Sequence, residues 1–527
     1  MYMDLDLTKR KYEFLRFHQQ KLTGTKTFPP YAKVARAKNT CYPEGHEVSD
    51  FGAKVDIIRL LEHTIIRILE FKGESKLQVL KNEKLSLLGK WGMDGASGQQ
   101  TTKQTWKSDS KIDTEDDESD IDDIFELEDL TDIDQTPKEL SDSTVFLTTF
   151  CQLKAGNEVI WQNPKPNSTF YCRPVEFIFK RETDNLVQKT FTYYDKQLKK
   201  VEAYCFEWKG LPIQVNFDIK PTMIDGKVHN ILSKNKASTC CNICLVGPKM
   251  INNIPYVTKL KCKSKFYKFG LSSLHSWIRT MEYVLHIAYS IGSDKSKMYK
   301  KHKTEKKMIL TKTKPKKLKL TKEQKTAIRN EEKERKRKRK TMIQQELKKQ
   351  LMLTVDVVKQ GAGTTNTGNV ARKFFSNAGT VAKITGVDEE IISRLHAILQ
   401  TITCGQNIDC RIFKMYSLET ALKCVDLYPW YKMPPSVHKY LIHGSDIILE
   451  IGYPMGWFSE EPQEASNKIF RKARLHFSRM YQRDKTNEDV LHYLLLSSDP
   501  LLASLRFQRD KDSKSLTEEA KSMLIEK

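Results

Sequence analysis

The sequence changes its pattern near residue 225, and this change restricts the fold more than any other feature. Before it, residues 144–180 alternate apolar and polar side chains between turn signals, which predicts two or three antiparallel strands. Residues 211–220 alternate in the same way and predict a half-buried strand. After residue 225, strand patterns become rare and helical periodicity takes over. We therefore expect an α+β chain in which a mixed sheet precedes a mainly helical part.

Three further segments indicate the order of the elements. Residues 50–72 carry apolar side chains at helical spacing, which predicts an amphipathic helix ahead of the sheet. The stretch KLSLLGKWGMDG, residues 84–95, indicates a strand that breaks at a glycine turn, and residues 184–208 indicate a helix. A chain of 527 residues is long enough to form two or more compact parts.

Positive charge is concentrated in one segment. The net charge is +23, and residues 294–350 contain 24 Lys or Arg against 7 Asp or Glu. A basic surplus of this kind favours a polyanionic partner, usually a nucleic acid. Residues 112–134 are instead strongly acidic. Each charge run also fits a solvated linker, which is the commoner meaning of such composition.

The compartment follows from what the sequence lacks. There is no apolar run of about 18 residues that could span a membrane, and the N-terminus has no signal-peptide pattern. The 11 cysteines are irregularly spaced, which argues against a disulfide framework. We therefore expect a reducing compartment, the cytosol or the nucleus.

Two aspartates follow strand patterns and precede a glycine. Asp94 lies in WGMDGASG, and Asp225 lies in PTMIDGKV, just after the strand expected at residues 211–220. A carboxylate at a strand end suits a divalent metal, because Mg²⁺ takes oxygen ligands. The alternative is that each Asp-Gly pair only makes a turn.

A third acidic candidate lies in MGWFSEEPQEASNKIFRKARLHFSRM. Pro462 suits the first turn of a helix, and Glu464 would then share one helix face with Lys468 and Arg471. That face fits a metal ligand flanked by phosphate contacts, or solvent-exposed ion pairs. A different face is expected to pack inward, and it contains Ile469, Ala473, Phe477 and Met480.

Cysteines and histidines at ligand-like spacing predict a zinc site. Cys241 and Cys244 form a CxxC pair, and a zinc ion needs four ligands. The one close histidine pair, His438 and His443, would complete a Cys2His2 set across nearly two hundred residues. Gly444 would let a helix end at His443 and turn its ring towards the pair. The alternative is that both histidines only pack in a helical core.

Many short motifs occur in an order that resembles one family. The motifs are KWGMDGASG, KPNSTFYCRPVEFIFKRETD, TMIDGKV, CNIC, LSSLHSWI, TGNVARKFF, HKYLIH and SEEPQEASNKIFRKAR. Over residues 80–500, this order resembles the Transib DNA transposases and the large recombinase subunit of antigen-receptor gene rearrangement, the recombination-activating family.

The resemblance implies an architecture. An RNase H-like mixed-sheet core is expected over residues 81–235, after an N-terminal helical segment of residues 1–80. A mainly helical zinc-binding insertion, residues 236–445, would interrupt this core. The basic segment of residues 294–350 would lie in that insertion, and residues 446–527 would form the C-terminal catalytic helix and tail.

The resemblance also implies the roles of individual residues. The catalytic acids would be Asp94, Asp225 and Glu464, with Glu182 as a further metal ligand. Together they would hold two Mg²⁺ or Mn²⁺ ions, and a two-metal site stabilises both the attacking and the leaving oxygen at phosphorus. One structural Zn²⁺ would be held by Cys241, Cys244, His438 and His443. Our candidates for DNA-backbone contacts are Asn369, Arg372, Lys373, Lys468, Arg471 and Lys472.

The activity implied is that of a DDE-type DNA transposase or recombinase in the nucleus. Such an enzyme nicks DNA at the terminal inverted repeats of an element, forms a hairpin and then transfers the strand. We expect a homodimer, and a helper subunit is a possible partner. Few residues precede Asp94, which leaves little room for an end-recognition domain. The alternative function is therefore a domesticated, catalytically idle DNA-binding or chromatin protein, whereas a redox role for the CxxC pair lacks a thioredoxin-like context.

Overall fold

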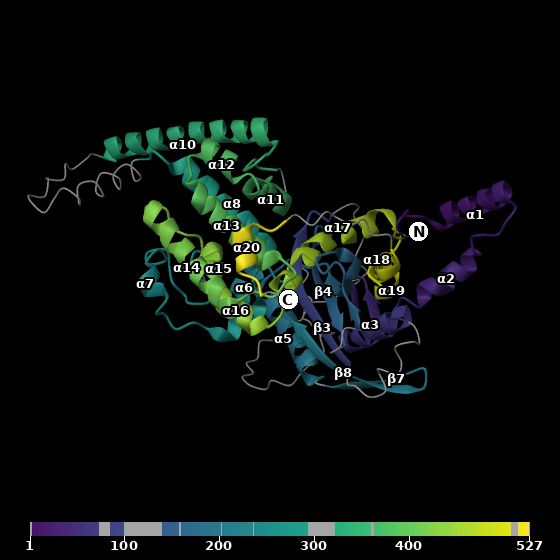
Figure 1. Ribbon diagram of the computed structural model, residues 1–527. Helices are drawn as coiled ribbons and strands as arrows, with labels where there is room; N and C mark the ends of the chain where they lie inside the picture. Colours follow the sequence, from purple (N-terminus) through teal and green to yellow (C-terminus); the bar gives the residue numbers. More distant parts are fainter. Residues whose placement is uncertain are drawn as a thin grey trace, which may run out of the picture. The chain divides into compact units, whose positions relative to one another are not determined.

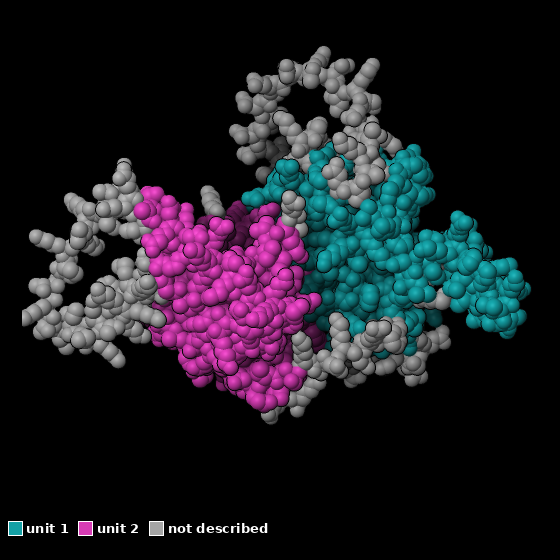
Figure 2. Space-filling view, turned by 90° about the horizontal axis from the view of Figure 1, so that it is seen from above, with its two compact units in different colours: residues 1–224, 461–511 teal, residues 225–460, 512–527 magenta. Residues whose placement is uncertain are grey.

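The chain forms two compact units, and each contains two stretches of sequence. A computed structural model describes residues 3–72, 85–99, 140–156, 160–201, 203–235, 237–293, 322–359, 363–506 and 515–525. The first unit consists of residues 1–224 and 461–511, and the second of residues 225–460 and 512–527 (Figure 2). Residues 225–460 of the second unit are therefore inserted into the chain of the first, and residues 512–527 belong to the second unit again. The acidic block at residues 112–134 and residues 294–321 of the basic segment lie outside the described residues.

A mixed sheet forms the centre of the first unit (Figure 1). Its strand order is β1-β2-β6-β4-β3-β8-β7, with β5 paired to β4. All neighbours are antiparallel except β3 and β8, which are parallel. Parallel neighbours need a crossover connection, and the chain between β6 and β8 supplies one that includes α5. The strands are β1 (His46–Ser49), β2 (Gly52–Val55), β3 (Leu85–Ser97), β4 (Thr144–Ala155), β5 (Trp161–Gln162), β6 (Cys172–Ile178), β7 (Tyr204–Trp208) and β8 (Leu211–Lys220).

Helices of the first unit cover both faces of this sheet. Trp91 of β3 stacks on Phe191 of α5 at 5.4 Å between ring centroids. Phe177 of β6 meets Phe470 of α17 edge to face at 5.0 Å. The helices are α1 (Lys9–Thr23), α2 (Tyr31–Asn39), α3 (Ile57–Lys72), α5 (Asp184–Lys200), α17 (Glu461–His476), α18 (Arg483–Ser497) and α19 (Pro500–Leu505), with the 3-10 turn η5 (Thr169–Tyr171).

The register places Asp94 on the α17 face of the sheet. Asp94 pairs with Leu147 of β4, and Leu147 pairs with Phe177 of β6, so the three residues share a face. Phe177 contacts α17, whereas Trp91, an odd number of positions from Asp94, points to the face covered by α5. α17 therefore crosses the sheet on the same side as the Asp94 side chain.

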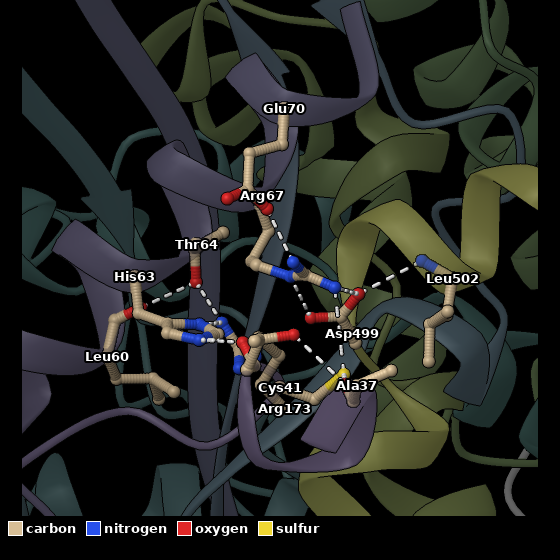
Figure 3. Close-up of polar contacts among 11 residues, drawn as sticks. Ala37, Cys41, Leu60, His63, Thr64, Arg67, Glu70, Arg173, Asp499 and Leu502 are labelled. Atoms are coloured by element: carbon tan, nitrogen blue, oxygen red, sulfur yellow. Dashed lines mark hydrogen bonds and ion pairs between the residues drawn. The ribbon is translucent and has the colours of Figure 1, made fainter. Parts of the chain in front are cut away.

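A buried polar network joins α3, β6 and the start of α19 within the first unit (Figure 3). Asp499 is fully buried and accepts hydrogen bonds from Arg67 Nε at 2.7 Å and Nη2 at 3.2 Å. Arg173 is also fully buried and donates to Thr64 Oγ1 at 2.7 Å. The buried carboxylate of Asp499 is thus paired with the Arg67 guanidinium, and its charge also acts on the buried Arg173. Burial of charge is tolerated only with such compensation.

The second unit is helical in its described part and is built around α8. The inward side of α8 buries Trp277, Met281, Val284 and Leu285, and Thr280 shares a hydrogen bond of 2.8 Å with the hydroxyl of Tyr440 on α15. The elements are α6 (Gly226–Leu232), α7 (Ile254–Val257), η6 (Ser264–Phe269), α8 (Ser273–Ser290), α10 (Lys322–Leu351), α11 (Gly368–Phe375), α12 (Ala378–Thr385), α13 (Glu389–Thr403), α14 (Cys410–Leu427), α15 (Pro435–Ile442), α16 (Gly444–Ile451), η7 (Met455–Phe458) and α20 (Glu518–Ser522).

Three expectations about local structure are wrong. β3 does not break at Asp94 but continues to Ser97. The helix expected over residues 184–208 ends at Lys200, and residues 204–208 form β7. On α17, Ala473 is buried as expected, but the buried face otherwise contains Gln463, Ser466 and Phe470, and Met480 is exposed.

None of the helices in the described ranges is long and apolar enough to cross a membrane.

Candidate functional site

Asp94 lies near the C-terminal end of β3, between two of the three glycines of this strand. A Cβ atom at Gly92 would lie 1.9 Å from the backbone oxygen of Met223, so only glycine allows this close approach of two chain segments. The amide of Met223 also donates to the carbonyl of Trp91 at 3.0 Å. The glycines that suggested a turn therefore serve close packing within a continuous strand, and Asp94 remains half-buried there.

α17 is held across the sheet by polar side chains. Gln463 donates from Nε2 to the carbonyl of Leu147, the cross-strand partner of Asp94, at 2.9 Å and also contacts the hydroxyl of Thr149. Asn467 donates from Nδ2 to Asp94 Oδ2 at 3.0 Å. Glu464 lies three positions before Asn467 and so shares its helix face. These contacts set Glu464 on the face of α17 that meets Asp94.

Glu182 lies beside the neighbour of Asp94 in the strand. It follows β6 and precedes the first turn of α5. A Cβ atom at Gly95 would lie 2.6 Å from Glu182 Oε2, so the missing side chain of Gly95 makes room for this carboxylate. Asp94, Glu464 and Glu182 therefore belong to the same end of β3, within the first unit. Asp94 and Glu464 are on the α17 face, whereas the space at Gly95 opens on the α5 face, because Gly95 and Trp91 are an even number of positions apart.

Asp225 is the first residue of the second unit. It follows Ile224, and its Oδ1 accepts a hydrogen bond from the amide of Val228 at 2.7 Å, which caps the N-terminus of α6. The expectation that Asp225 follows a strand is confirmed, since β8 ends at Lys220. The alternative considered for this residue was an Asp-Gly turn, and the structure shows Asp225 as a helix cap.

The six candidate DNA contacts fall into two groups. Lys468 and Arg471 are exposed on α17, but Lys472 is bound to Asp6, with Nζ at 2.8 Å from Oδ1 and 2.7 Å from Oδ2. The hydrogen bond that Lys472 donates to the Asp6 carboxylate raises the pKa of Lys472. In the second unit, Asn369 and Lys373 are exposed on α11, and the Arg372 guanidinium lies 5.8 Å from the ring centroid of Trp277.

The four predicted zinc ligands form a buried cluster in the second unit. One ligand atom from each of Cys241, Cys244, His438 and His443 lies within 4.8 Å of the others. Cys244 Sγ is 3.4 Å from His438 Nε2, and a tetrahedral zinc ion with ordinary bond lengths separates sulfur from nitrogen by about 3.6 Å. His443 ends α15 and precedes α16, and its buried Nε2 has no hydrogen-bond partner among the residues that the structure describes. The donor set and its spacing fit a zinc ion.

The loop that carries the two cysteines is shaped for a metal. The amide of Ile243 donates to Cys241 Sγ at 3.4 Å, and the amide of Cys241 donates to the carbonyl of Val246 at 3.0 Å. The hydrogen bond from the Cys244 thiol, with His438 and His443 close by, lowers the pKa of Cys241 and raises that of Cys244. The thiolate is the form that binds a metal, so the cluster already favours one ligand in its binding form.

Sequence reasoning missed four residues of these two sites. Gln463 and Asn467 position α17, and Gly95 makes room for Glu182. Cys262 Sγ lies 3.6 Å from Nδ1 of His443, where a thiol can orient the ligand ring from behind. The sequence could have indicated Gln463 and Asn467, because they are within one helical turn of Glu464. It gave no signal for Cys262, because this cysteine lies outside any ligand-like spacing pattern.

Comparison with known proteins does not assign the chain to a family. No protein-family model matches it, and a search of curated proteins finds no significant match.

Proposed function

We propose that this protein is a DDE-type DNA transposase or recombinase, which cuts DNA by nicking and hairpin formation with two divalent metal ions and then transfers the strand. The observation that carries the proposal is the hydrogen bond of 3.0 Å between Asn467 and Asp94. It joins the helix that carries Glu464 to the strand that carries the first aspartate, although 373 positions separate the bonded residues in the chain.

The strand order supports an RNase H-like core as part of this proposal. β3, β4 and β6 are antiparallel neighbours, α5 follows them, and β8 then lies parallel to β3. RNase H-like cores share this order and carry their first catalytic aspartate on the strand that corresponds to β3. The insertion of residues 225–460 before α17 fits the interruption that the family resemblance implies.

The chemistry assigned to the acids is phosphodiester displacement. Asp94, Glu464 and Asp225 are the proposed ligands of the divalent ions, with Glu182 as a further acid. The bound ions would supply charge stabilisation for the attacking and the leaving oxygen. Asn467 would hold the Asp94 carboxylate in one orientation, and the exposed Lys468 and Arg471 on α17 would contact the DNA backbone.

The Cys/His cluster has a structural role in this proposal. One Zn²⁺ held by Cys241, Cys244, His438 and His443 would fix the loop after α6 to the end of α15. Terminal inverted repeats in double-stranded DNA are the proposed substrate, a homodimer with a helper subunit is the proposed assembly, and the nucleus is the proposed location.

Metal-dependent cleavage of DNA tests the function. Purified protein with Mn²⁺ or Mg²⁺ should convert supercoiled plasmid to nicked circles, and end-labelled duplexes should yield hairpins on denaturing gels. Glu464→Gln should abolish both products while DNA binding persists. Glu461→Gln removes the same charge from the same helical turn and should leave both products unchanged.

The alternative function makes a different prediction in the same assay. A domesticated DNA-binding or chromatin protein would bind the duplex but leave it intact with either metal, in the unmodified protein as well as in Glu464→Gln. Equal nicking by the unmodified protein and by Glu464→Gln would instead point to a contaminating nuclease and contradict the assigned role.

A further inference from the structure

α10 is fixed to the second unit along one face. Arg339 donates from Nε to the carbonyl of Ala288 at 2.6 Å and from Nη2 to the carbonyl of Thr385 at 2.8 Å. Ile343 and Leu347, one and two turns further on, are fully buried. A guanidinium bound to two backbone carbonyls and two buried aliphatic side chains on one stripe fix the rotation of the helix about its axis.

Polar side chains beside this stripe also contact the rest of the second unit. Lys340 Nζ is 3.8 Å from Asp356 and 5.5 Å from the ring centroid of Tyr289, and Gln344 donates to the carbonyl of Val355 at 2.8 Å. Burial lowers the pKa of Arg339, and the group still stays a cation because an arginine titrates far above neutral pH. The inward-facing basic residues thus hold the helix in place.

The opposite face of α10 is basic and exposed. It carries five exposed cationic side chains, Lys333, Arg337, Lys338, Lys348 and Lys349. Two exposed acids, Glu331 and Glu334, lie among them, and Glu334 is 3.8 Å from Arg337, whose side chain is 81% exposed. Lys333 and Lys348 are fifteen positions apart, which is about 22 Å along a helix axis. A rigid helix therefore presents a row of cations at fixed positions.

We infer that the exposed face of α10 is a docking surface for the phosphate backbone of duplex DNA. Phosphates recur along the duplex and are bound by Lys and Arg without sequence choice, so a fixed row of cations on a straight helix is complementary to them. The inference deepens the proposed function and rests on it for the identity of the partner, because it assigns DNA binding to residues of α10 in addition to those of the acidic centre.

A nuclear-import receptor is the other class of partner that basic residues attract. Binding as an extended peptide would require α10 to unwind and Arg339 to leave its two carbonyl partners. Backbone binding to DNA uses the helix as it stands. The structure therefore favours DNA, and the test separates the two.

The test measures how DNA affinity depends on salt. The full-length protein is titrated against a labelled duplex at several NaCl concentrations by fluorescence anisotropy. One variant replaces four cations of α10, Arg337, Lys338, Lys348 and Lys349, by Gln. A matched control replaces four exposed lysines of α5, Lys189, Lys196, Lys199 and Lys200, by Gln. Both variants lose the same net charge, and Gln keeps helix propensity.

The α10 variant should weaken binding by about tenfold or more near physiological salt, and its log–log salt slope should fall by about two to four, since each lost phosphate contact removes about 0.9 from it. The α5 control should keep the slope of the unmodified protein. Equal effects of both variants, or no change in the α10 variant, would overturn the inference. Loss of nuclear accumulation with unchanged DNA binding would overturn it in favour of an import receptor.

Cleavage by the same proteins separates this inference from the proposed function. At saturating DNA, the α10 variant should nick at the rate of the unmodified protein, because α10 carries none of the proposed metal ligands. If the unmodified protein binds with the expected slopes but never nicks, the proposed function fails and the docking surface stands. If it nicks while the α10 variant keeps the full slope, the docking surface fails alone.

Discussion

Asp499 is the fully buried carboxylate that binds Arg67 in the network of Figure 3, and its charge also acts on the buried Arg173. Asp499→Asn keeps the shape of the side chain but removes this buried anion from beside the Arg67 guanidinium. Breaking a buried ion pair by removing one partner costs about 3 to 5 kcal/mol, so the free energy of unfolding of the first unit should fall by that amount. Urea denaturation followed by tryptophan fluorescence measures it.

Glu70 provides the matched control. It also pairs with Arg67, but its side chain is 37% exposed, and exposed pairs contribute under about 1 kcal/mol. Glu70→Gln should therefore change the free energy of unfolding only slightly. Similar decreases in the free energy of unfolding of the two variants would mean that the burial of Asp499 adds nothing to the stability that this ion pair provides.

His63 makes the first unit sensitive to acid. Burial and the neighbouring Arg173 lower the pKa of His63 to about 3, and its ring lies between the carbonyl of Thr40 at 3.0 Å and Arg173 Nη1 at 3.2 Å. Arg173 is a donor, so Nδ1 accepts and the neutral ring donates from Nε2 to Thr40. Above pH 6.5 both folded and unfolded chains hold this residue neutral, and below it only the unfolded chain takes up the proton.

The free energy of unfolding should therefore fall as the pH drops from about 6.5 towards 3, with a slope from this group of up to about 1.4 kcal/mol per pH unit. His63→Gln keeps a donor and an acceptor but does not titrate, so its stability should depend on pH less steeply in this range. Parallel pH profiles for the two proteins would exclude His63 as the source.

At the scale of elements, the Cys/His cluster joins the loop after α6 to the end of α15, 194 positions apart between Cys244 and His438. Protein purified without chelator should contain one zinc ion per chain by elemental analysis. Cys241→Ser should lose the zinc and lower the thermal midpoint, because a structural ion stabilises the fold that binds it. Cys240→Ser changes the adjacent position outside the cluster and should retain the zinc ion and the thermal midpoint of the unmodified protein. Loss of zinc from Cys241→Ser and Cys240→Ser alike would contradict the ligand assignment.

The sequence predicted this cluster better than it predicted the elements around Asp94. Cysteine and histidine spacing reports ligand chemistry directly, and the four residues meet as expected. Glycine is ambiguous, because it makes turns but also permits close approach. Gly92 and Gly95 suggested the end of a strand, whereas they make room for Met223 and Glu182 inside β3.

Tertiary contacts explain the remaining errors. Residues 204–208 form a strand because β8 pairs with them through a tight turn in which Lys209 and Gly210 both have positive φ. Gln463 is buried on α17, although it is polar, because the backbone of β4 offers it a partner. Helical periodicity alone favoured the apolar stripe through Met480, and no periodic pattern reports a hydrogen bond to a distant strand.

For the whole molecule, the division into two units predicts two separable unfolding transitions. Each unit has its own core, and proteins of several units commonly depart from two-state behaviour. In scanning calorimetry of the full chain, removal of zinc with a chelator should lower one transition, and Asp499→Asn should lower the other. A single transition that shifts as a whole under both changes would mean that the units unfold together.

The insertion of the second unit also sets an order of events during synthesis. A ribosome releases β3 and the Glu182 segment early, but α17 emerges only after all of residues 225–460 have been made. At about 5 to 20 residues per second, that delay is on the order of ten to fifty seconds. No nascent chain can therefore bring Glu464 to Asp94 before residues 225–460 of the second unit have been made.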